Sequence, residues 1–252
     1  MVARIACSSP LGRVVFQKKG RNGVVPGNLT RAIADIVSPR FCVGCEERLS
    51  LGERYICETC LKGIPLLNDS GLSEAELNHF PDGVIDKMIA ISWFSETSPL
   101  RHLIHNLKYF DDFPVGKFLG HLLWKMQQAR FERINIDLII PVPLHKLRLV
   151  ERGYNQSFEI ASGLAAGLTK KVENDVVERS RFTHQQVGSV NRHEREINMR
   201  KAFSVLRPLA VTGMDILIVD DVITTGSTIR GVATELMEAG AASVHAASIL
   251  IA

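Results

Sequence analysis

The sequence lacks any apolar run of about 18 residues, the length that a membrane-spanning helix requires. Its amino-terminal end also lacks the apolar stretch of a secretory signal, so we expect neither membrane insertion nor secretion. No internal repeat or low-complexity tract is present. With 46% apolar and 23% charged residues, the 252 residues are typical of a globular protein with one α/β core and a small accessory module.

Acidic residues are missing from the start of the chain, where Asp35 is the first. Residues 1–65 carry 10 Lys or Arg against 5 Asp or Glu, whereas the rest carries 20 against 22. We expect residues 1–28 to form a basic, disordered arm. An over-long translation start and an organellar transit peptide are the alternatives, although glycines and a proline between residues 20 and 27 interrupt any amphipathic helix there.

Cysteine is scarce, and four of the five cysteines form two C-x-x-C pairs that are separated by eleven residues: Cys42, Cys45, Cys57 and Cys60. This is good spacing for a tetrahedral Zn²⁺ site, and because four sulfurs leave no open position for a substrate, we expect structural zinc. Two redox-active dithiols are the alternative. Paired thiolates without a secretory signal predict a reducing compartment, the cytoplasm. The fifth, Cys7, is expected to be a plain free thiol.

Basic and aromatic side chains surround these cysteines: Arg40, Phe41, Arg48, Arg54, Tyr55 and Lys62. Charge with interspersed aromatic rings is typical of single-stranded nucleic-acid binding. A small zinc module also needs a polar surface for solubility, and two aromatic residues are few. Both interpretations therefore stay open.

Strand-like and helix-like stretches alternate after the cysteines. Short apolar runs predict strands at 84–94, 137–142, 216–219 and 243–251, and apolar residues three to four apart predict helices from Pro99, Phe118, Phe158 and about Thr228. This alternation predicts a parallel α/β sheet with helices on both faces. We expect residues 29–66 to hold a short helix and the zinc-ribbon module, 67–83 to be a linker that could hold one helical turn, and 84–252 to form the α/β domain.

The strongest functional signal is the stretch from Ile216 to Thr228. An apolar strand delivers two acids, Asp220 and Asp221, and a turn of small polar residues leads into a helix: Thr224, Thr225, Gly226, Ser227 and Thr228. Turn amides, hydroxyls and a helix amino-terminus suit a phosphate, and the carboxylates suit ribose hydroxyls or a hydrated Mg²⁺. An ordinary capped turn is the alternative, but strand, acids, turn and helix follow in the order that a sugar phosphate needs. Neither G-x-x-x-x-G-K-[ST] nor G-x-G-x-x-G is present.

Two basic stretches precede this loop. The strand at 137–142 is followed by His145, Lys146, Arg148 and Arg152, which we expect to form a loop that could neutralise a pyrophosphate. Residues 179–201 carry six Lys or Arg, with Arg181 and Arg192 among them, and are expected to form a mobile flap. Solvated polar loops are the alternative for both stretches. Neither stretch offers an obvious general base.

The stretch from Ile216 to Thr228 resembles the phosphoribosyl pyrophosphate (PRPP) motif of type I phosphoribosyltransferases. The resemblance implies that Asp220 and Asp221 contact the ribose hydroxyls and that residues 224–228 hold the 5′-phosphate. With Asn106-Leu107-Lys108-Tyr109, Pro141-Val142-Pro143-Leu144 and Arg152-Gly153-Tyr154-Asn155-Gln156, residues 30–252 are similar to the ComF family, which more commonly has Phe in place of Tyr154. The family resemblance implies a type I phosphoribosyltransferase fold, an amino-terminal zinc module and a link to DNA uptake in natural transformation.

Several functions are compatible with these motifs. The chain could transfer phosphoribose from PRPP, with Mg²⁺, to an acceptor that the sequence does not identify. It could instead be a non-catalytic protein that uses this fold to bind single-stranded DNA or a nucleotide. A nucleotide-salvage phosphoribosyltransferase is a third, less favoured alternative. The expected partners are PRPP, single-stranded DNA and other DNA-uptake proteins, and the sequence leaves the oligomeric state open.

Overall fold

The computed structural model describes residues 39–109, 112–179 and 202–252, which belong to two compact units, Met1–Ile64 and Pro65–Ala252. The predicted basic arm, the short helix before the cysteines and the predicted flap with Arg181 and Arg192 lie outside the described residues. Within those described residues, no helix is both long enough and apolar enough to cross a membrane.

The first unit is built around the cysteines. A single antiparallel bridge joins Phe41 to Arg48, and the short helix α2 (Glu58–Lys62) begins at Cys57, whose sulfur accepts a hydrogen bond from the Cys60 amide. Among the described residues of this unit, 39–64, few are buried: Cys42 and three aliphatic side chains, Leu49, Ile56 and Ile64. A core of this size contributes little stability by itself.

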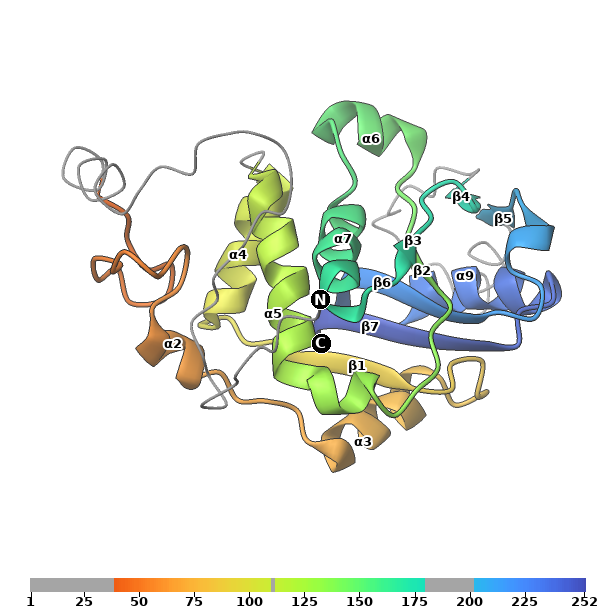
Figure 1. Ribbon diagram of the computed structural model, residues 1–252, viewed down its shortest axis with the longest axis horizontal. Coiled ribbons are helices and arrows are strands. Elements are labelled where there is room, and N and C mark those ends of the chain that lie inside the picture. The colour runs from red at the N-terminus through yellow and green to blue at the C-terminus, as the bar shows by residue number, and fades with distance from the viewer. Residues whose placement is uncertain (1–38, 110–111, 180–201) are drawn as a thin grey trace, which may run out of the picture. The chain divides into compact units, whose positions relative to one another are not determined.

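The second unit holds a five-stranded sheet in the order β1-β7-β6-β2-β3 (Figure 1). The strands are β1 (Met88–Trp93), β2 (Leu138–Pro141), β3 (Lys171–Val172), β6 (Asp215–Ile223) and β7 (Ser243–Ile251), and each pairs with its neighbours in parallel. The predicted parallel sheet is therefore confirmed. A separate antiparallel pair consists of β4 (Val177–Arg179) and β5 (Phe203–Val205).

Helices cover both faces of the sheet. On one face lie α4 (Pro99–Tyr109), α5 (Phe113–Phe131) and α7 (Gln156–Leu168), and Figure 1 shows α5 and α7 crossing in front of the strands. The backbones of α5 and α7 approach so closely that a Cβ on Gly120 would lie 1.9 Å from the Ile160 carbonyl oxygen. The periodicity that predicted a helix from Pro99 is confirmed, because α4 buries the four apolar residues that defined it: Leu100, Leu103, Ile104 and Leu107.

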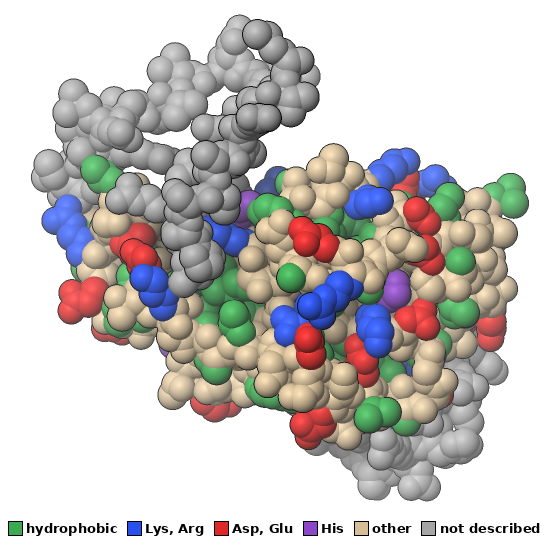
Figure 2. Space-filling view, turned by 60° about the horizontal axis from the view of Figure 1, so that its bottom comes forward, with side chains coloured by type: hydrophobic (Ala, Val, Ile, Leu, Met, Phe, Trp, Pro, Cys, Tyr) green, Lys and Arg blue, Asp and Glu red, His purple; other side chains and the backbone are tan. Residues whose placement is uncertain are grey.

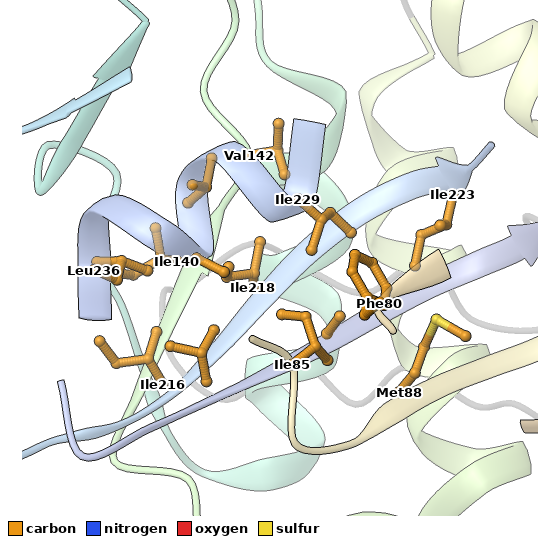
Figure 3. Close-up of a cluster of buried hydrophobic side chains, with 14 of the residues drawn as sticks. Phe80, Ile85, Met88, Ile140, Val142, Ile216, Ile218, Ile223, Ile229 and Leu236 are labelled. Carbon is orange, nitrogen blue, oxygen red and sulfur yellow. The ribbon is translucent and has the colours of Figure 1, made fainter. Parts of the chain in front are cut away.

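The other face packs against α3 (Asp69–His79) and α9 (Ser227–Glu238). Strand residues such as Ile140, Ile216 and Ile218 meet Ile229 and Leu236 of α9 in one apolar cluster (Figure 3). Alternate residues of a strand point to opposite faces, which explains why Leu217 and Val219 are buried but lie outside this cluster.

Two segments differ from the expectation. Residues 67–83, expected to be a linker that could hold one helical turn, contain the eleven-residue helix α3, which buries Leu72 and Ala75. Only two buried side chains define its inner face, so its sequence shows little apolar periodicity. The basic loop after β2 is instead the seven-residue helix α6 (Lys146–Arg152), with His145 as its N-cap and Gly153 as its C-cap.

Candidate functional site

The two acids lie within strand β6, which continues to Ile223, and do not follow its end as the sequence suggested. Asp220 Oδ1 accepts a hydrogen bond from Ser157 Oγ at 2.9 Å and another from the Asp221 amide at 2.9 Å. The Oδ2 oxygen of Asp221 lies 2.8 Å from Lys108 Nζ. The acids of one strand are thus held by the last turn of α4 and the first turn of α7.

Burial and the neighbouring carboxylate of Asp221 raise the pKa of Asp220 to about 7. The hydrogen bonds from Ser157 and from the Asp221 amide, together with the charge of Lys108, oppose this shift but do not cancel it. Two adjacent carboxylates in a poorly hydrated place repel each other, so Asp220 is only partly ionised at neutral pH. The pair can therefore accept hydroxyl protons in hydrogen bonds and attracts positive charge.

A half-buried guanidinium lies in the electrostatic field of Asp220. Burial lowers the pKa of Arg179, at the end of β4, while the charge of Asp220 raises it and that of Arg148 lowers it further. The Arg179 guanidinium carbon lies 5.5 Å from the centre of the Phe203 ring. Arg179 and Arg148 thus add positive charge at this edge of the sheet, as a bound pyrophosphate would require.

The predicted phosphate turn leads from β6 into α9. Gly226 is the N-cap of α9 with a left-handed φ of 71°, and Thr225 Oγ1 donates to Ser227 Oγ at 2.9 Å and accepts from the Ser227 amide at 3.4 Å. Thr224 and Thr225 are exposed, whereas Ser227 and Thr228 are half-buried. Hydroxyls and first-turn amides therefore gather at the amino-terminus of a twelve-residue helix, where an anion is favoured.

The residues after α3 form a wall behind this turn. A Cβ on Gly226 would lie 3.0 Å from Phe80 Cε1, so a larger residue here would have to displace this ring by a few tenths of an ångström. Arg230 of α9 stacks over the same ring at 5.7 Å, donates to the His79 carbonyl and pairs with Asp82. The segment expected to be a linker thus packs against the turn and fixes it. No local motif predicts this contact, so the sequence analysis missed it.

The four basic residues predicted to bind pyrophosphate contact neighbours other than the acid pair. His145 Nδ1 accepts from the Leu147 amide at 3.2 Å, Lys146 pairs with Glu178 at 3.6 Å, Arg148 with Glu151 at 3.7 Å, and Arg152 donates to Gln156 Oε1 at 3.1 Å. The ion pairs of Lys146 and Arg148 involve exposed basic side chains and are weak. Pyrophosphate binding by these residues stays a prediction.

The segment from Arg152 to Gln156 ties the elements of the site together. The Tyr154 hydroxyl donates to the Leu107 carbonyl at the end of α4, and Asn155 donates to the Val142 carbonyl at 3.0 Å while capping α7. Gln156 is only 2% exposed, and its Nε2 has no hydrogen-bond partner within the part of the chain that is described. Because buried amide groups are seldom left unpaired, Gln156 is a candidate ligand donor.

Sequence reasoning named the acids and the turn but not Lys108, Ser157 or Arg179 as parts of this site. For Lys108 a signal existed, since it stands in a segment that resembles the ComF family, although the resemblance gave it no role. Arg179 begins the stretch 179–201 that was expected to form the flap, although it was given no role of its own. Ser157 carries no such signal, because its proximity to Asp220 arises only from the packing of α7.

The four predicted zinc ligands come together in the first unit. The sulfurs of Cys42, Cys45, Cys57 and Cys60 all lie within 4.8 Å of one another, and they could hold a metal ion such as zinc. Amides of Gly44 and Cys57 donate to the Cys42 sulfur at 3.4 and 3.3 Å.

The thiols differ strongly in acidity. Burial by itself would raise the pKa of Cys42, but the surrounding backbone amides outweigh it and lower this pKa to about 7. Burial and the neighbouring thiols raise the pKa of Cys60. Backbone amides stabilise one thiolate, while neighbouring thiols resist ionisation. A cation bound between the sulfurs would stabilise the thiolate form of all of them, so the donor set fits zinc.

This chain is similar in sequence to a known domain family and to known bacterial proteins. Residues 154–251 match the phosphoribosyl transferase domain family. Competence protein F of Haemophilus influenzae is 30% identical over 221 residues, which cover 81% of this chain and 93% of that protein. DNA utilization protein YhgH of Escherichia coli K12 is 31% identical over 221 residues, 82% of this chain and 95% of that protein.

The parallel sheet, the acid pair and the turn before α9 define a protein of the phosphoribosyltransferase fold, as the sequence predicted. The chain belongs to the family of competence protein F and YhgH, which confirms the predicted ComF relationship. Glutamine PRPP amidotransferase from B. subtilis, complexed with ADP and GMP, is 26% identical with a TM-score of 0.36. The match spans 53% of this chain and 25% of that one, and this likeness is too weak to indicate a shared function.

Proposed function

We propose that this chain binds PRPP with Mg²⁺ at the acid pair and the phosphate turn, and that it acts in the cytoplasm in the handling of DNA that enters the cell. The observation that carries the first part is the placement of Asp220 and Asp221 on β6 directly before the turn and amino-terminus of α9. The relatives named for competence and DNA utilization support the second part.

In this proposal each part of the site has one task. The carboxylates of Asp220 and Asp221 accept hydrogen bonds from the ribose hydroxyls, and the hydroxyls and amides of residues 224–228 hold the 5′-phosphate. Oxygen donors of this kind fit Mg²⁺, which would neutralise charge on the pyrophosphate. Arg148 and Arg179 would face that pyrophosphate from the side of α6 and β4.

A thermal-shift experiment tests PRPP binding. Adding PRPP with Mg²⁺ should raise the melting temperature of the wild-type protein, because a ligand that binds only the folded state stabilises it. The double variant Asp220→Asn, Asp221→Asn should lose this rise, whereas the control Asp175→Asn, an exposed acid of the same unit, should keep it. An unchanged wild-type melting temperature would overturn the proposal.

Phosphoribosyl transfer is a second candidate, favoured by the match to the phosphoribosyl transferase domain. Release of pyrophosphate from PRPP should be measured with purine, pyrimidine and nicotinate-type acceptors, each with and without single-stranded DNA. Turnover that is lost in the Asp220→Asn, Asp221→Asn variant would make the chain an enzyme. Binding without turnover in every mixture would leave it a binding protein.

Single-stranded DNA binding is the further part of the proposal, and the cysteine unit is its candidate surface. The Arg54 guanidinium lies 5.1 Å above the Tyr55 ring, so cation and aromatic face are presented together. On the face in Figure 2, Lys and Arg side chains of the described residues are mixed with Asp and Glu. The described residues therefore form no broad basic patch on this face that would serve as an alternative DNA-binding surface.

Affinity for single-stranded DNA should fall steeply with salt and should weaken when Arg54 and Lys62 are changed to alanine. Arg207→Ala, which removes an exposed cation of the other unit, is the control and should leave the affinity unchanged. Binding that does not respond to salt would contradict this part of the proposal.

A further inference from the structure

The acid pair has a cation of the chain itself beside it. Lys108 Nζ lies 2.8 Å from Asp221 Oδ2, and the two side chains are only 27% and 12% exposed. A contact with so little exposure is much less screened by water than a surface ion pair. Lys108 comes from the last turn of α4 and Asp221 from the middle of the sheet, so the fold and not the local sequence brings the two together.

The backbone next to Lys108 is fixed from two sides. Leu107 is fully buried, and its carbonyl accepts the hydroxyl of Tyr154. Carbonyls in the last turn of a helix have no partner within the helix, so this bond anchors the end of α4. The Tyr154 ring in turn meets Phe113, the first residue of α5, edge-on at 4.2 Å between ring centres. Lys108 is thus presented by a packed helix end.

The other carboxyl group is occupied as well. Asp220 Oδ1 accepts hydrogen bonds from the Ser157 hydroxyl and the Asp221 amide, so one oxygen of each acid is engaged by groups of the chain itself. A divalent cation that binds two neighbouring carboxylates needs negative charge that no other cation has neutralised.

We infer that Lys108 is the resident cation of the acid pair: its ammonium group neutralises Asp221 and keeps free divalent metal ions from binding there until the phosphosugar brings its own. The identity of that ligand rests on the proposed function, but the role of Lys108 toward metal ions does not. The metal ion then enters as a complex with the pyrophosphate. The pyrophosphate oxygens supply the negative charge that Lys108 has neutralised on Asp221. Lys108 is a positioning residue in this sense, since it sets the order in which metal and sugar bind.

Mn²⁺ titration, followed by the electron paramagnetic resonance signal of the free ion, tests this role on the zinc-loaded protein without PRPP. Wild type should bind no more Mn²⁺ than the Asp220→Asn, Asp221→Asn variant, which gives the background from other sites. Lys108→Met keeps the length of the side chain but removes its charge, and should bind Mn²⁺ at least tenfold more tightly than wild type. Lys108→Arg, which keeps the charge, should behave as wild type. Equal Mn²⁺ affinity in wild type and Lys108→Met would overturn the inference.

Lys108→Gln provides a second neutral variant in case the methionine variant does not fold, and the same gain in Mn²⁺ affinity is expected. As a separate readout, Mg²⁺ alone should raise the melting temperature of either neutral variant but not that of wild type. A PRPP-dependent shift in wild type without these gains would refute the role of Lys108 and leave PRPP binding intact. The gains without any PRPP-dependent shift would do the reverse.

Discussion

The two units of this chain are stabilised by different physics. In the part of the cysteine unit that the structure describes, the buried aliphatic side chains are few, and four sulfurs lie within 4.8 Å of one another. In the phosphoribosyltransferase unit, β6 alone buries four consecutive apolar residues from Ile216 to Val219, each at 0% exposure. A very small core usually needs a further constraint such as a metal ion, which these four sulfurs could hold, whereas a large core does not. We therefore expect a substitution to act through metal binding in the cysteine unit and through packing or strain in the phosphoribosyltransferase unit.

The largest effect is expected in the cysteine unit. Cys42→Ser removes the buried sulfur that receives two backbone amides, and should abolish zinc binding, which in small zinc modules is worth about 10 kcal/mol or more. Zinc content per chain should fall to background, and residues 39–64 should become sensitive to protease, while the PRPP-induced rise in melting temperature persists. Cys7→Ser is the control and should retain zinc. Full zinc content in Cys42→Ser would mean that the cysteine unit does not depend on this sulfur to bind the metal ion.

A core substitution tests the other unit. Ile218→Ala opens a cavity in the cluster between β6 and α9 and should lower the free energy of unfolding by about 2–5 kcal/mol, without loss of zinc. Urea denaturation followed by circular dichroism measures it. Val150→Ala, at a side chain that is 83% exposed, should change this free energy by less than about 0.5 kcal/mol. Similar losses in both variants would mean that packing does not dominate this unit.

The acid pair makes the second unit sensitive to pH. Asp220 has a pKa of about 7 in the folded state against 3.8 as its ordinary value, so the folded state binds its proton more tightly. The stability contributed by this group is therefore fully present below about pH 4 and is lost as pH rises to about 7. Asp220→Asn should remove this loss and gain about 1–4 kcal/mol at pH 8 relative to wild type.

Urea midpoints at pH 5 and pH 8 measure the difference. Asp175→Asn is a matched control, because hydrogen bonding to Arg207 lowers the pKa of Asp175 and gives no reason for a gain at pH 8. If wild type and Asp220→Asn lose stability equally between the two pH values, Asp220 does not retain its proton.

The smallest effect concerns the phosphate turn. Gly226→Ala combines a left-handed φ of 71° with a contact of 3.0 Å to Phe80, and should cost about 1–3 kcal/mol and reduce the PRPP-induced rise in melting temperature. Gly83→Ala has nearly the same φ, 69°, but no atom within 4 Å of the new Cβ. It should keep the full PRPP response. An equal response in both variants would show that the Phe80 wall does not shape the turn.

Local patterns made much of this fold predictable. The apolar spacing of α4, the strand at 243–251 and the thiol spacing each depend on residues close in sequence, and all are confirmed. Helix α3 was missed because only Leu72 and Ala75 define its buried face. Helix α6 was missed because it has no buried residue, so no apolar period marks it.

Local sequence patterns identify which chemical groups are available: an acid pair before a glycine-containing turn, and four cysteines with the spacing of a metal site. How those acids are charged and held depends on the packing of distant elements. Lys108 reaches Asp221 from α4, Ser157 reaches Asp220 from α7, and Phe80 supports Gly226 from the end of α3. Charge and burial depend on distances in space, and no local pattern encodes distances between residues that are far apart along the chain.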